Sequence, residues 1–551
     1  MRKLLSVAWM MALFATPGYA TTMSGTVTGP DGAPFRAAFV RAQDVKTKIT
    51  TSVLSDNQGK YWVDLSPGLY DVWVQSTGYK SDRRSDVKVD GAQAVPVNFA
   101  LQKSLVQWNQ LTKHQGAFLL PEGPGRDVVR DQCFSCHGMG RMGSVGRRDK
   151  NGWLDSMARM PALGGPTVKP QIASTVAEYL ATVFGPDSET PLSPAQLPAY
   201  QKIKQEHDYF SDEALNAVYV DYPLTASGDM RDRPGTGYPD KAGNVWMEMA
   251  GGLAKLNTTT GELKTFRLSD PKRPGIHEVV PSRDGMSVWL TVTDQNAIAR
   301  FDTKTETFDP VFKDPYDGEK PAQQEPNTPW PELRKSPGGQ SGAPRTHTAI
   351  LDLDGNVWAS GRPLKKFDVK TKEFRNFSDV PDTYGIALDK QGNVWFAEFN
   401  SRDHWNIGKV DVKTNKVTKW EPPDGEVGRP RRLKIDSQGN VWFGQYFDGA
   451  IAKFDPKTEK FTQYKLPGPM PTVYGLGIDA NDNVWYASMY TDVIGRIDPK
   501  TGKIVEFPSP YGERATRDMW PDAQGRMWFG NQPYRSVGSI YVRPSNARPG
   551  N

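Results

Sequence analysis

A tetrad of the type Gly-Asn-Val-Trp recurs through the C-terminal part of the chain and limits the available folds more than any other feature. Its last position is held by Trp246, Trp289, Trp358, Trp395, Trp442, Trp485 and Trp528, at intervals of 43, 69, 37, 47, 43 and 43 residues. Repeats of about 40–45 residues with several short apolar segments each are typical of four-stranded propeller blades. Seven tetrads therefore predict a seven-bladed β-propeller over residues 214–545.

The last repeat is one strand short, because it stops after the apolar segment 539–542. Residues 217–220, ahead of the first tetrad, read Ala-Val-Tyr-Val and would supply the missing outer strand. Such a strand would close the ring of blades. An array of separate, unclosed sandwiches is the alternative.

Residues 23–102 alternate short apolar segments with turns such as Pro-Asp-Gly at 30–32 and Asn-Gln-Gly at 57–59. Period-two alternation with frequent turns predicts an antiparallel β-sandwich. The string Gly-Thr-Val-Thr-Gly-Pro-Asp-Gly-Ala-Pro at 25–34, with segments 56–61 and 65–72, resembles the carboxypeptidase regulatory-like domain. The resemblance implies packing or partner contact, and we interpret this domain as a spacer or docking module.

Residues 133–137 read Cys-Phe-Ser-Cys-His and contain both cysteines of the chain. Two thiols at this spacing can bond both haem vinyl groups, and the following histidine can ligate the iron. A redox pair and half of a zinc site are the alternatives. No further Cys or His follows nearby at zinc-ligand spacing, and the βαβ pattern of a thioredoxin-like pair is absent. The motif predicts one covalent haem c held by Cys133, Cys136 and His137.

Residues 126–186 are predicted to form a small all-α cytochrome c domain between linkers 103–125 and 187–213. Its closing helix would bury a set at helical spacing: Ile172, Val176, Tyr179, Leu180, Val183 and Phe184. Met160 is the preferred sixth iron ligand, because Pro161 ends a helix there and can leave the thioether in a loop. It also stands seven residues after Trp153, as in the small c-type cytochromes that this string resembles.

Other arrangements at the iron stay open. Met139, Met142 and Met157 are further candidates for the sixth ligand. Alternatively, Met157 and Met160 fill the core, as methionine often does, and His207 ligates the iron or the position is vacant.

The N-terminus reads as a targeting segment rather than as part of a domain. Arg2 and Lys3 precede an apolar stretch at 4–15, and the small residues Gly18 and Ala20 suit cleavage after position 20. A retained membrane anchor would need about 20 apolar residues, and no later stretch is long enough either. We expect a periplasmic or secreted chain that does not span a membrane. The net charge of +5, without Lys or Arg runs, argues against nucleic-acid binding.

One face of the propeller gathers the residues that could do chemistry. In a four-stranded meander labelled a to d from the axis outward, the b–c connection and the d–a crossover share a face. Positions that enter strand a carry His277, His347, Tyr384, Arg431, Tyr474 and Arg517, and positions that leave strand b carry Glu398, Gln445, Ser488 and Asn531. His404 falls in a b–c loop of the same face. The 69-residue interval contains extra residues between 309 and 345 that the other repeats lack. This segment is rich in Pro and Gly and predicts an ordered lid with Trp330 in its middle.

Residues 384–398 (Tyr-Gly-Ile-Ala-Leu-Asp-x-x-Gly-Asn-Val-Trp-Phe-Ala-Glu) are similar to the repeat of the virginiamycin B lyase, or streptogramin lyase, family. That family uses two histidines in consecutive blades, two acidic residues and a divalent metal. The resemblance implies His347, Asp382, Tyr384 and Glu398 as the corresponding positions. Tyr384 replaces the second histidine, and a phenol with its usual pKa of about 10 is a poor metal ligand and base.

These observations lead to a multidomain, mainly β protein with three functional hypotheses. The first is a haem c-linked oxidoreductase that binds a small organic substrate at the propeller face, with candidate catalytic residues His347, Glu398, Tyr384, Asp382, His277, His404 and Arg431. The second is an electron-transfer protein without chemistry of its own that docks a periplasmic redox partner. The third is a lyase of the streptogramin type. Two interpretations of this propeller face stay open. In the first, His347, Glu398 and His404 bind a divalent cation such as Mg²⁺; in the second, the side chains only fill a polar channel.

Overall fold

In the computed structural model, the described residues are 21–90, 94–131, 133, 147–159, 168, 170–203, 210–224, 232–316, 345–399, 406–422, 430–446, 449–467, 472–512 and 516–544. Several predictions fall outside them: the signal peptide 1–20, Cys136 and His137, Met139, Met142 and Met160, His207, His404, and residues 317–344 of the lid.

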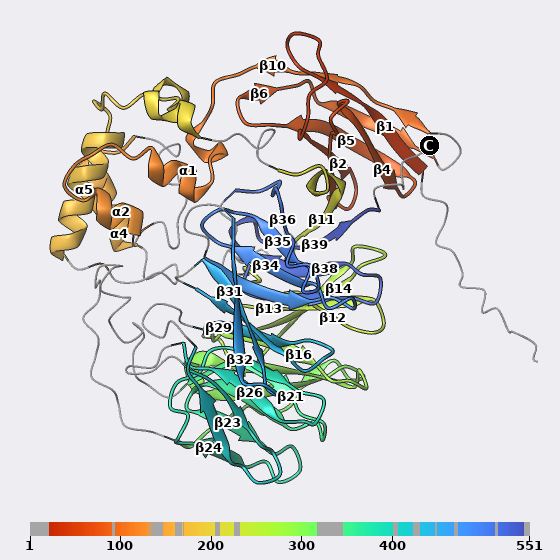
Figure 1. The fold of residues 1–551 in the computed structure, drawn as a ribbon, viewed down its shortest axis with the longest axis vertical. Helices are drawn as coiled ribbons and strands as arrows, with labels where there is room; N and C mark the ends of the chain where they lie inside the picture. Colours follow the sequence, from red (N-terminus) through yellow and green to blue (C-terminus); the bar gives the residue numbers. More distant parts are fainter. Residues whose placement is uncertain are drawn as a thin grey trace, which may run out of the picture.

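The C-terminal part folds as a propeller of seven antiparallel sheets in the described part of the chain (Figure 1). In the first six, the strands follow one another in sequence order from the axis outward. Blades 1 to 3 consist of β12 (Tyr238–Pro239), β13 (Asn244–Met249), β14 (Gly252–Asn257) and β15 (Leu263–Arg267); β16 (Ile276–Pro281), β17 (Ser287–Val292), β18 (Ala297–Asp302), β19 (Thr307–Phe308) and the added β20 (Phe312–Lys313); and β21 (Arg345–Leu351), β22 (Val357–Arg362), β23 (Leu364–Phe367) and β24 (Phe374–Phe377).

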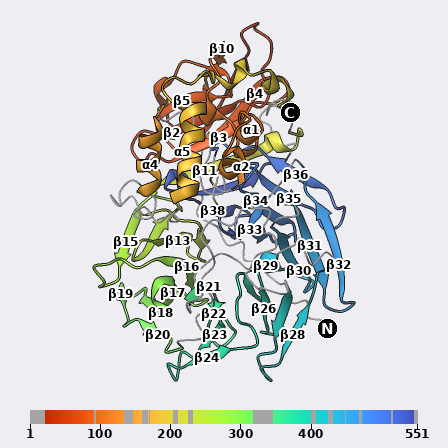
Figure 2. The ribbon, with the colours of Figure 1, turned by 90° about the vertical axis from the view of Figure 1, so that its left-hand side faces the viewer.

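Blades 4 to 6 continue the same pattern. They consist of β25 (Ile386–Leu388), β26 (Val394–Ala397), β27 (Ile407–Val410) and β28 (Val417–Trp420); β29 (Pro430–Ile435), β30 (Val441–Gln445), β31 (Ala450–Asp455) and β32 (Lys460–Lys465); and β33 (Val473–Ile478), β34 (Val484–Ser488), β35 (Ile494–Ile497) and β36 (Ile504–Phe507). Figure 2 looks onto the ring, with the first blades on the left and the later ones on the right.

Blade 7 closes the ring as the sequence predicts. It consists of β37 (Met519–Pro521), β38 (Met527–Asn531), β39 (Ser536–Val542) and, as its outer strand, β11 (Ala217–Pro223). The register of β11 on β39 is antiparallel from Ala217 opposite Val542 to Pro223 opposite Ser536. Contacts between β12 and both β16 and β37 complete the inner ring of strands.

The tetrads form a local structure that explains why they repeat. Asp389, six residues before Trp395, accepts the backbone N–H groups of Gln391 and Asn393 at 3.0 and 2.8 Å and the indole N–H of Trp395 at 3.1 Å. Gly392 supplies the positive φ of 87° that the turn requires. The carboxylate thus fixes the a–b turn and satisfies the only polar atom of a buried indole side chain. The same Asp–Trp hydrogen bond occurs in every blade except blade 2, which has Arg283 at that position.

The N-terminal residues form the predicted β-sandwich. Its strands are β1 (Thr21–Thr28), β2 (Phe39–Asp44), β3 (Thr50–Leu54), β4 (Lys60–Leu65), β5 (Gly68–Gln75), β6 (Tyr79–Lys80), β7 (Arg84–Val89), β8 (Val95–Pro96), β9 (Phe99–Ala100) and β10 (Gln102–Lys103). Met23, Val27, Val40, Val53 and Val72 are among the residues of its buried core.

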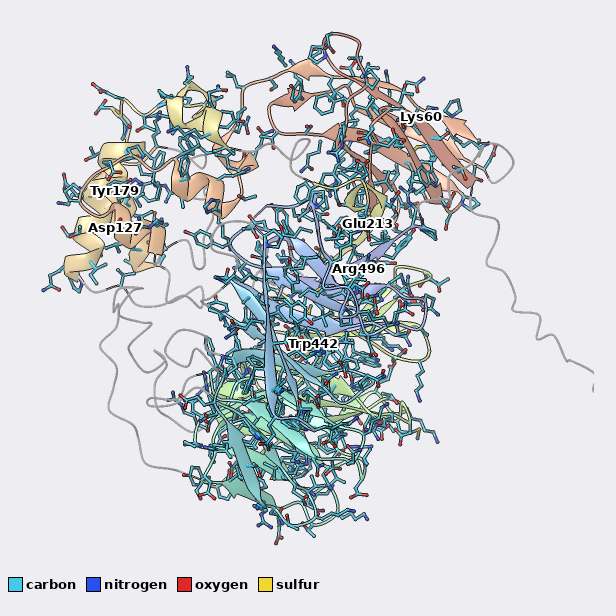
Figure 3. All side chains as sticks on the ribbon, viewed as in Figure 1. Lys60, Asp127, Tyr179, Glu213, Trp442 and Arg496 are labelled. Carbon is cyan, nitrogen blue, oxygen red and sulfur yellow. The ribbon has the colours of Figure 1, made fainter. Side chains whose placement is uncertain are left out.

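The sandwich and the propeller share one sheet. β3 pairs antiparallel with β11, so that eight strands run in the order β37-β38-β39-β11-β3-β2-β5-β7. Val218 of β11 lies in the core of the sandwich although it belongs to a blade. The sandwich therefore covers the outer edge of blade 7, an edge that would otherwise present unpaired backbone groups. Glu213, just before β11, also forms ion pairs with Arg496 and Lys503 of blade 6 (Figure 3).

In the sequence, the helices and short 3₁₀ turns lie between the sandwich and the propeller. They are η1 (Trp108–Gln110), α1 (Lys113–Phe118), α2 (Arg126–Asp131), α4 (Lys150–Ala158), α5 (Pro170–Phe184), η4 (Pro194–Gln196), η5 (Pro198–Lys202) and η6 (Ala214–Asn216). A helix is observed where the sequence predicts one: α5 buries Val176, Tyr179, Leu180, Val183 and Phe184. The same core includes Trp108, Leu111 and Tyr200, so residues of both predicted linkers pack with the helices.

Among the described residues, no helix combines the length and the apolar character that a membrane span needs.

Candidate functional site

The structure brings the predicted strand-a positions together at one end of the propeller channel. We call this set the channel mouth: His277, His347, Tyr384, Arg431, Tyr474 and Arg517. The imidazole rings of His277 and His347 lie 3.5 Å apart between centroids, and that of His347 lies 4.2 Å from the ring of Tyr384. The phenol oxygens of Tyr384 and Tyr474 are 2.7 Å apart. Three consecutive contacts therefore link blades 2, 3, 4 and 6.

Arg431 lies inside an aromatic cage formed by Tyr384, Phe399, Tyr446 and Tyr474. Its guanidinium carbon is 3.7 Å from the ring centroid of Tyr474, 4.3 Å from that of Tyr446, and 4.6 and 4.8 Å from those of Tyr384 and Phe399. Its Nη2 group donates a hydrogen bond of 2.9 Å to the phenol oxygen of Tyr384. Ring faces stabilise a cation that has left water, so Arg431 keeps its charge at the mouth.

Two cations give Tyr384 an unusual acidity. Burial alone would raise the pKa of its phenol, but Arg431, Arg432 and the hydrogen bond from Tyr474 together lower that pKa to about 8. Burial and the neighbouring Tyr384 raise the pKa of Tyr474 to about 12. Tyr384 is therefore the phenol that ionises, and Tyr474 donates to it. The sequence argument against Tyr384 as a base assumed a pKa of about 10, which these neighbours change.

The two histidines of the mouth are neutral. Burial, followed by the charges of nearby arginines, holds the pKa of His277 well below its usual value. Burial, His277 and Arg345 do the same to the pKa of His347. Nδ1 of His347 lies 3.1 Å from the hydroxyl of Thr348, whereas Nδ1 of His277 has no hydrogen-bond partner among the described residues. Neutral imidazoles in this position can accept a proton or a hydrogen bond.

Below the mouth, charged side chains fill the channel. Nη1 of Arg432 donates a hydrogen bond of 2.7 Å to Thr348 and lies 3.6 Å from a carboxylate oxygen of Glu278 and 3.8 Å from one of Asp518. Lys434 forms an ion pair of 2.9 Å with Asp518. Side chains of blades 2, 3, 5 and 7 thus meet at the axis, as the interpretation of a polar plug requires. The sequence analysis missed this network, although the Arg-Arg-Leu-Lys string at 431–434 signalled it.

The two predicted acidic residues have other partners than the histidines. Both carboxylate oxygens of the buried Glu398 are engaged, one by Lys419 at 2.7 Å and the other by Asn406 at 2.8 Å. Asp382 forms an ion pair with Arg362. Among the described residues, no group of three or more His, Cys, Asp and Glu side chains could hold a metal ion. Because both carboxylate oxygens of Glu398 are engaged, the described donors do not fit a divalent cation. His404 lies outside the described residues, so the site of His347, Glu398 and His404 stays a prediction.

The remaining strand-b positions are buried, and the side-chain amides of Gln445 and Asn531 have atoms without a hydrogen-bond partner among the described residues. Gln445, Ser488 and Asn531 are buried at the ends of β30, β34 and β38. The amide oxygen of Gln445 accepts a hydrogen bond of 2.8 Å from Gln463 within its own blade.

A loop of blade 6 connects the helices to the mouth. The Tyr490 hydroxyl donates a hydrogen bond of 3.4 Å to the carbonyl oxygen of Arg130, three residues before Cys133. The Tyr490 carbonyl oxygen accepts the backbone N–H of His114 at 3.0 Å. Its neighbour Met489 packs against the aromatic cage. One short loop therefore touches both the segment that leads into the haem motif and the rings around Arg431.

Comparison with known proteins supports two parts of this description. The sequence profile of the carboxypeptidase regulatory-like domain matches residues 22–102. The profile of the virginiamycin B lyase family matches residues 368–546. Both resemblances are thereby confirmed for these segments, the second covering blades 4 to 7 and part of blade 3. No curated protein matches the chain.

Solved structures with similar propellers include a streptogramin B lyase (18% identity, 60% of this chain and 100% of that chain, TM-score 0.49). Another is the selenomethionine-substituted virginiamycin B lyase from Staphylococcus aureus (17% identity, 59% of this chain and 100% of that chain, TM-score 0.49). At these values the likeness says nothing about the reaction.

Proposed function

We propose that this chain is an exported c-type haem protein that oxidises a small acidic organic molecule at the channel mouth and passes the electrons to a periplasmic partner. The observation that carries the proposal is the loop of blade 6, because it joins the residues before Cys133 to the aromatic cage. Neither a lyase nor a passive propeller requires such a junction.

Cys133, the residue of the Cys-Phe-Ser-Cys-His motif that the structure describes, has apolar surroundings that support this proposal. The side chain of Cys133 is partly buried and packs against an apolar core that includes Trp153 and Met157. Cys133, Cys136 and His137 would hold the group, with Met160 as the expected sixth ligand. When bound, haem c would supply a one-electron acceptor, which suits electron transfer.

The mouth has the chemistry to bind an anion and to accept protons. Arg431 carries its charge into the mouth, and the buried Nε and Nη2 groups of Arg345 have no hydrogen-bond partner among the described residues. A carboxylate of the substrate would satisfy these donors. Oxidation of a substrate hydroxyl group releases two protons and two electrons. The Tyr384 phenolate can accept one of the protons, the other passes to water, and the two electrons leave one at a time.

Anaerobic spectroscopy of the purified haem-loaded protein tests this proposal. We expect a class of small hydroxy acids to reduce the haem, and Tyr384→Phe to slow that reduction about 100-fold, the usual contribution of a general base. The control Tyr464→Phe removes a hydroxyl from the outer strand of blade 5, and the reduction rate should stay unchanged. An unchanged oxidised spectrum in both variants would show that the haem itself is intact.

A second candidate function is that of an electron-transfer module whose propeller only docks a redox partner. The charge network of Arg432, Glu278 and Asp518, which plugs the channel, favours it. Rapid reduction by a partner protein, with no reduction by any small molecule, would overturn the oxidoreductase and leave this module. A streptogramin-type lyase rests on the family profile alone, and the engaged carboxylates of Glu398 and Asp382 count against it.

A further inference from the structure

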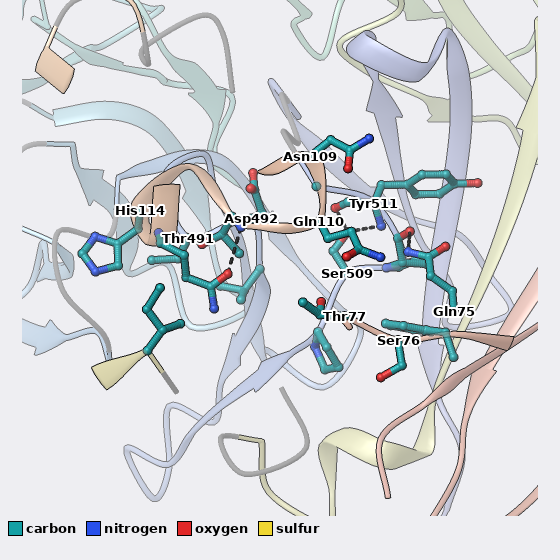
Figure 4. Close-up of a pocket in the computed structure, with 18 of the residues that line it drawn as sticks. Gln75, Ser76, Thr77, Asn109, Gln110, His114, Thr491, Asp492, Ser509 and Tyr511 are labelled. Atoms are coloured by element: carbon teal, nitrogen blue, oxygen red, sulfur yellow. Dashed lines mark hydrogen bonds between the residues drawn. The ribbon is translucent and has the colours of Figure 1, made fainter. Parts of the chain in front are cut away.

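A cavity of about 610 Å³ opens at the junction of the sandwich, the 107–118 segment and blades 6 and 7 (Figure 4). This volume suits a ligand of several rings, since small-molecule sites measure about 300–1,000 Å³. The cavity lies outside the channel mouth and shares none of its residues. In Figure 4, His114 and Tyr511 lie toward opposite ends, with Gln110 and Thr77 between them, so the cavity is elongated.

The lining combines apolar side chains with many amide and hydroxyl groups. The side chains that reach it include Gln75, Ser76, Thr77, Gln107, Asn109 and Gln110. The side chain of Asn109 and the Nε2 group of Gln110 form no hydrogen bond among the described residues. An amide offers two donors and an acceptor, and a hydroxyl offers one donor and two lone pairs. Such a lining matches a ligand that carries many hydroxyl groups.

The charged side chains around the cavity are Arg41, Lys202, Asp492 and Glu506; their charges cancel, and three of the four have hydrogen-bond partners. Arg41 is buried and donates hydrogen bonds to Gln75 at 2.8 Å and to the phenol oxygen of Tyr511 at 2.6 Å. Asp492 accepts the backbone N–H of Lys113 at 3.3 Å, and Glu506 accepts the Tyr486 hydroxyl at 2.9 Å.

Two further features favour a neutral ligand in this cavity. Burial lowers the pKa of His114, so its imidazole is neutral at pH 7. Arg41 in turn holds Gln75 and Tyr511 in place before any ligand arrives, which reduces the entropy cost of binding. A ligand without net charge would therefore leave every one of these pairs intact.

Aromatic rings stand at the rim. Tyr534 is 44% exposed and its ring lies 4.6 Å from that of Tyr511, while Phe118 on the opposite wall is 47% exposed. Exposed ring faces beside hydrogen-bonding groups suit the apolar C–H faces of sugar rings.

From this lining, we infer that the cavity between the sandwich, the 107–118 segment and blades 6 and 7 binds a neutral oligosaccharide. The amides Asn109 and Gln110 would bind its hydroxyl groups, and Tyr534 would pack against one ring. The site is independent of the redox proposal, since no residue of the mouth takes part.

Calorimetric titration of the full-length, haem-loaded protein tests this inference with three probes: maltotriose, cellotriose and triacetylchitotriose. At least one should bind with a dissociation constant of about 1 mM or tighter. Tyr534→Ala and Asn109→Ala should each weaken that binding about tenfold, since they remove the ring and the amide that contact the ligand.

Tyr316→Ala serves as the matched control, because Tyr316 is another exposed tyrosine, 38% accessible, that lies beyond β20 of blade 2. Its affinity should equal that of the wild type. Absence of binding by all three sugars, or equal weakening by Tyr316→Ala, would overturn the inference. Binding of trialanine in place of the sugars would also overturn it, by assigning the cavity to peptides.

Discussion

Tyr384 and Tyr474 share a hydrogen bond of 2.7 Å across the channel mouth, yet their surroundings move the pKa values of the two phenols in opposite directions. Both side chains are buried, and burial alone raises the pKa of each. The difference lies in the guanidinium group of Arg431, which donates its hydrogen bond to Tyr384. Arg431 of blade 5 therefore decides that Tyr384, and not Tyr474, is the phenol that ionises. Tyr384 stands where the resemblance to the lyase family predicts a histidine.

Replacing that cation should reverse the selection. In Arg431→Met we expect the pKa of Tyr384 to rise from about 8 to at least the usual 10 of a phenol. Burial raises this pKa, and the variant removes the positive charge that lowers it. Ultraviolet difference spectra of phenolate formation between pH 6 and about 11 would measure the change. Arg375→Met, on the exposed face of blade 3, is the control and should leave the titration as it is. An unchanged titration in Arg431→Met would contradict this account.

The plug below the mouth predicts how stability depends on pH. Burial raises the pKa of Glu278 from 4.5 to about 8, even with Arg432 nearby. The folded chain then holds a proton that the unfolded chain has lost between these pH values. The resulting stabilisation is complete below about pH 4.5 and is lost as the pH rises through 8. We expect Glu278→Gln to remove this contribution, so that its free energy of unfolding falls less than that of the wild type between pH 5 and 8.

Denaturant unfolding at a series of pH values would compare the two proteins. Glu262→Gln offers a control, since Glu262 lies in a turn of blade 1 far from the axis. Parallel pH profiles of Glu278→Gln and the wild type would show that the carboxyl group is ionised in the folded chain.

The sequence was informative where one residue type repeats with a fixed period, and poor where residues from different blades meet. Trp395 and its equivalents predicted seven blades, because each indole needs the same buried position in its own repeat. The outer strand of blade 7 was predicted at 217–220 because the last repeat is one strand short, and the structure has it at 217–223. Arg432 and Glu278 lie 154 positions apart in the sequence, and no local pattern announces that they meet at the axis.

The same reasoning explains Glu398. Its place after strand b was predicted, but the choice between His347 and Lys419 as its partner depends on side-chain directions that the sequence does not specify. The pairing of β3 with β11 was also beyond prediction, because neither strand sequence specifies which strand of another domain lies beside it.

This shared sheet should make the sandwich and the propeller unfold together. Val218 of β11 is buried in the core of the sandwich, so Val218→Asp places an unpaired charge between the two. We expect a loss of about 3–5 kcal/mol and the splitting of one calorimetric transition into two. Val218→Ile keeps the apolar contact and should retain a single transition. A single transition in Val218→Asp would show that the sandwich is not coupled to blade 7 through this strand.

Tyr490 should couple the helices to the mouth in a similar way. Its hydroxyl reaches the carbonyl oxygen of Arg130, and its backbone carbonyl binds the N–H of His114. Tyr490→Ala removes the ring but neither cysteine, so the amount of covalent haem and its oxidised spectrum should stay unchanged. The helices would hold less firmly to blade 6, and the amide of His114 should exchange with solvent about ten times faster, which hydrogen-exchange mass spectrometry measures.

Tyr464→Ala, on the outer strand of blade 5, is the matched control and should leave the exchange of His114 as it is. Slower reduction of the haem in Tyr490→Ala, together with faster exchange, would mean that contact between helices and blade 6 limits electron transfer. Unchanged exchange of the His114 amide would exclude Tyr490 as the coupling residue. If the Tyr490 ring holds the helices to blade 6, its removal must also loosen the hydrogen bond between the Tyr490 carbonyl oxygen and this amide.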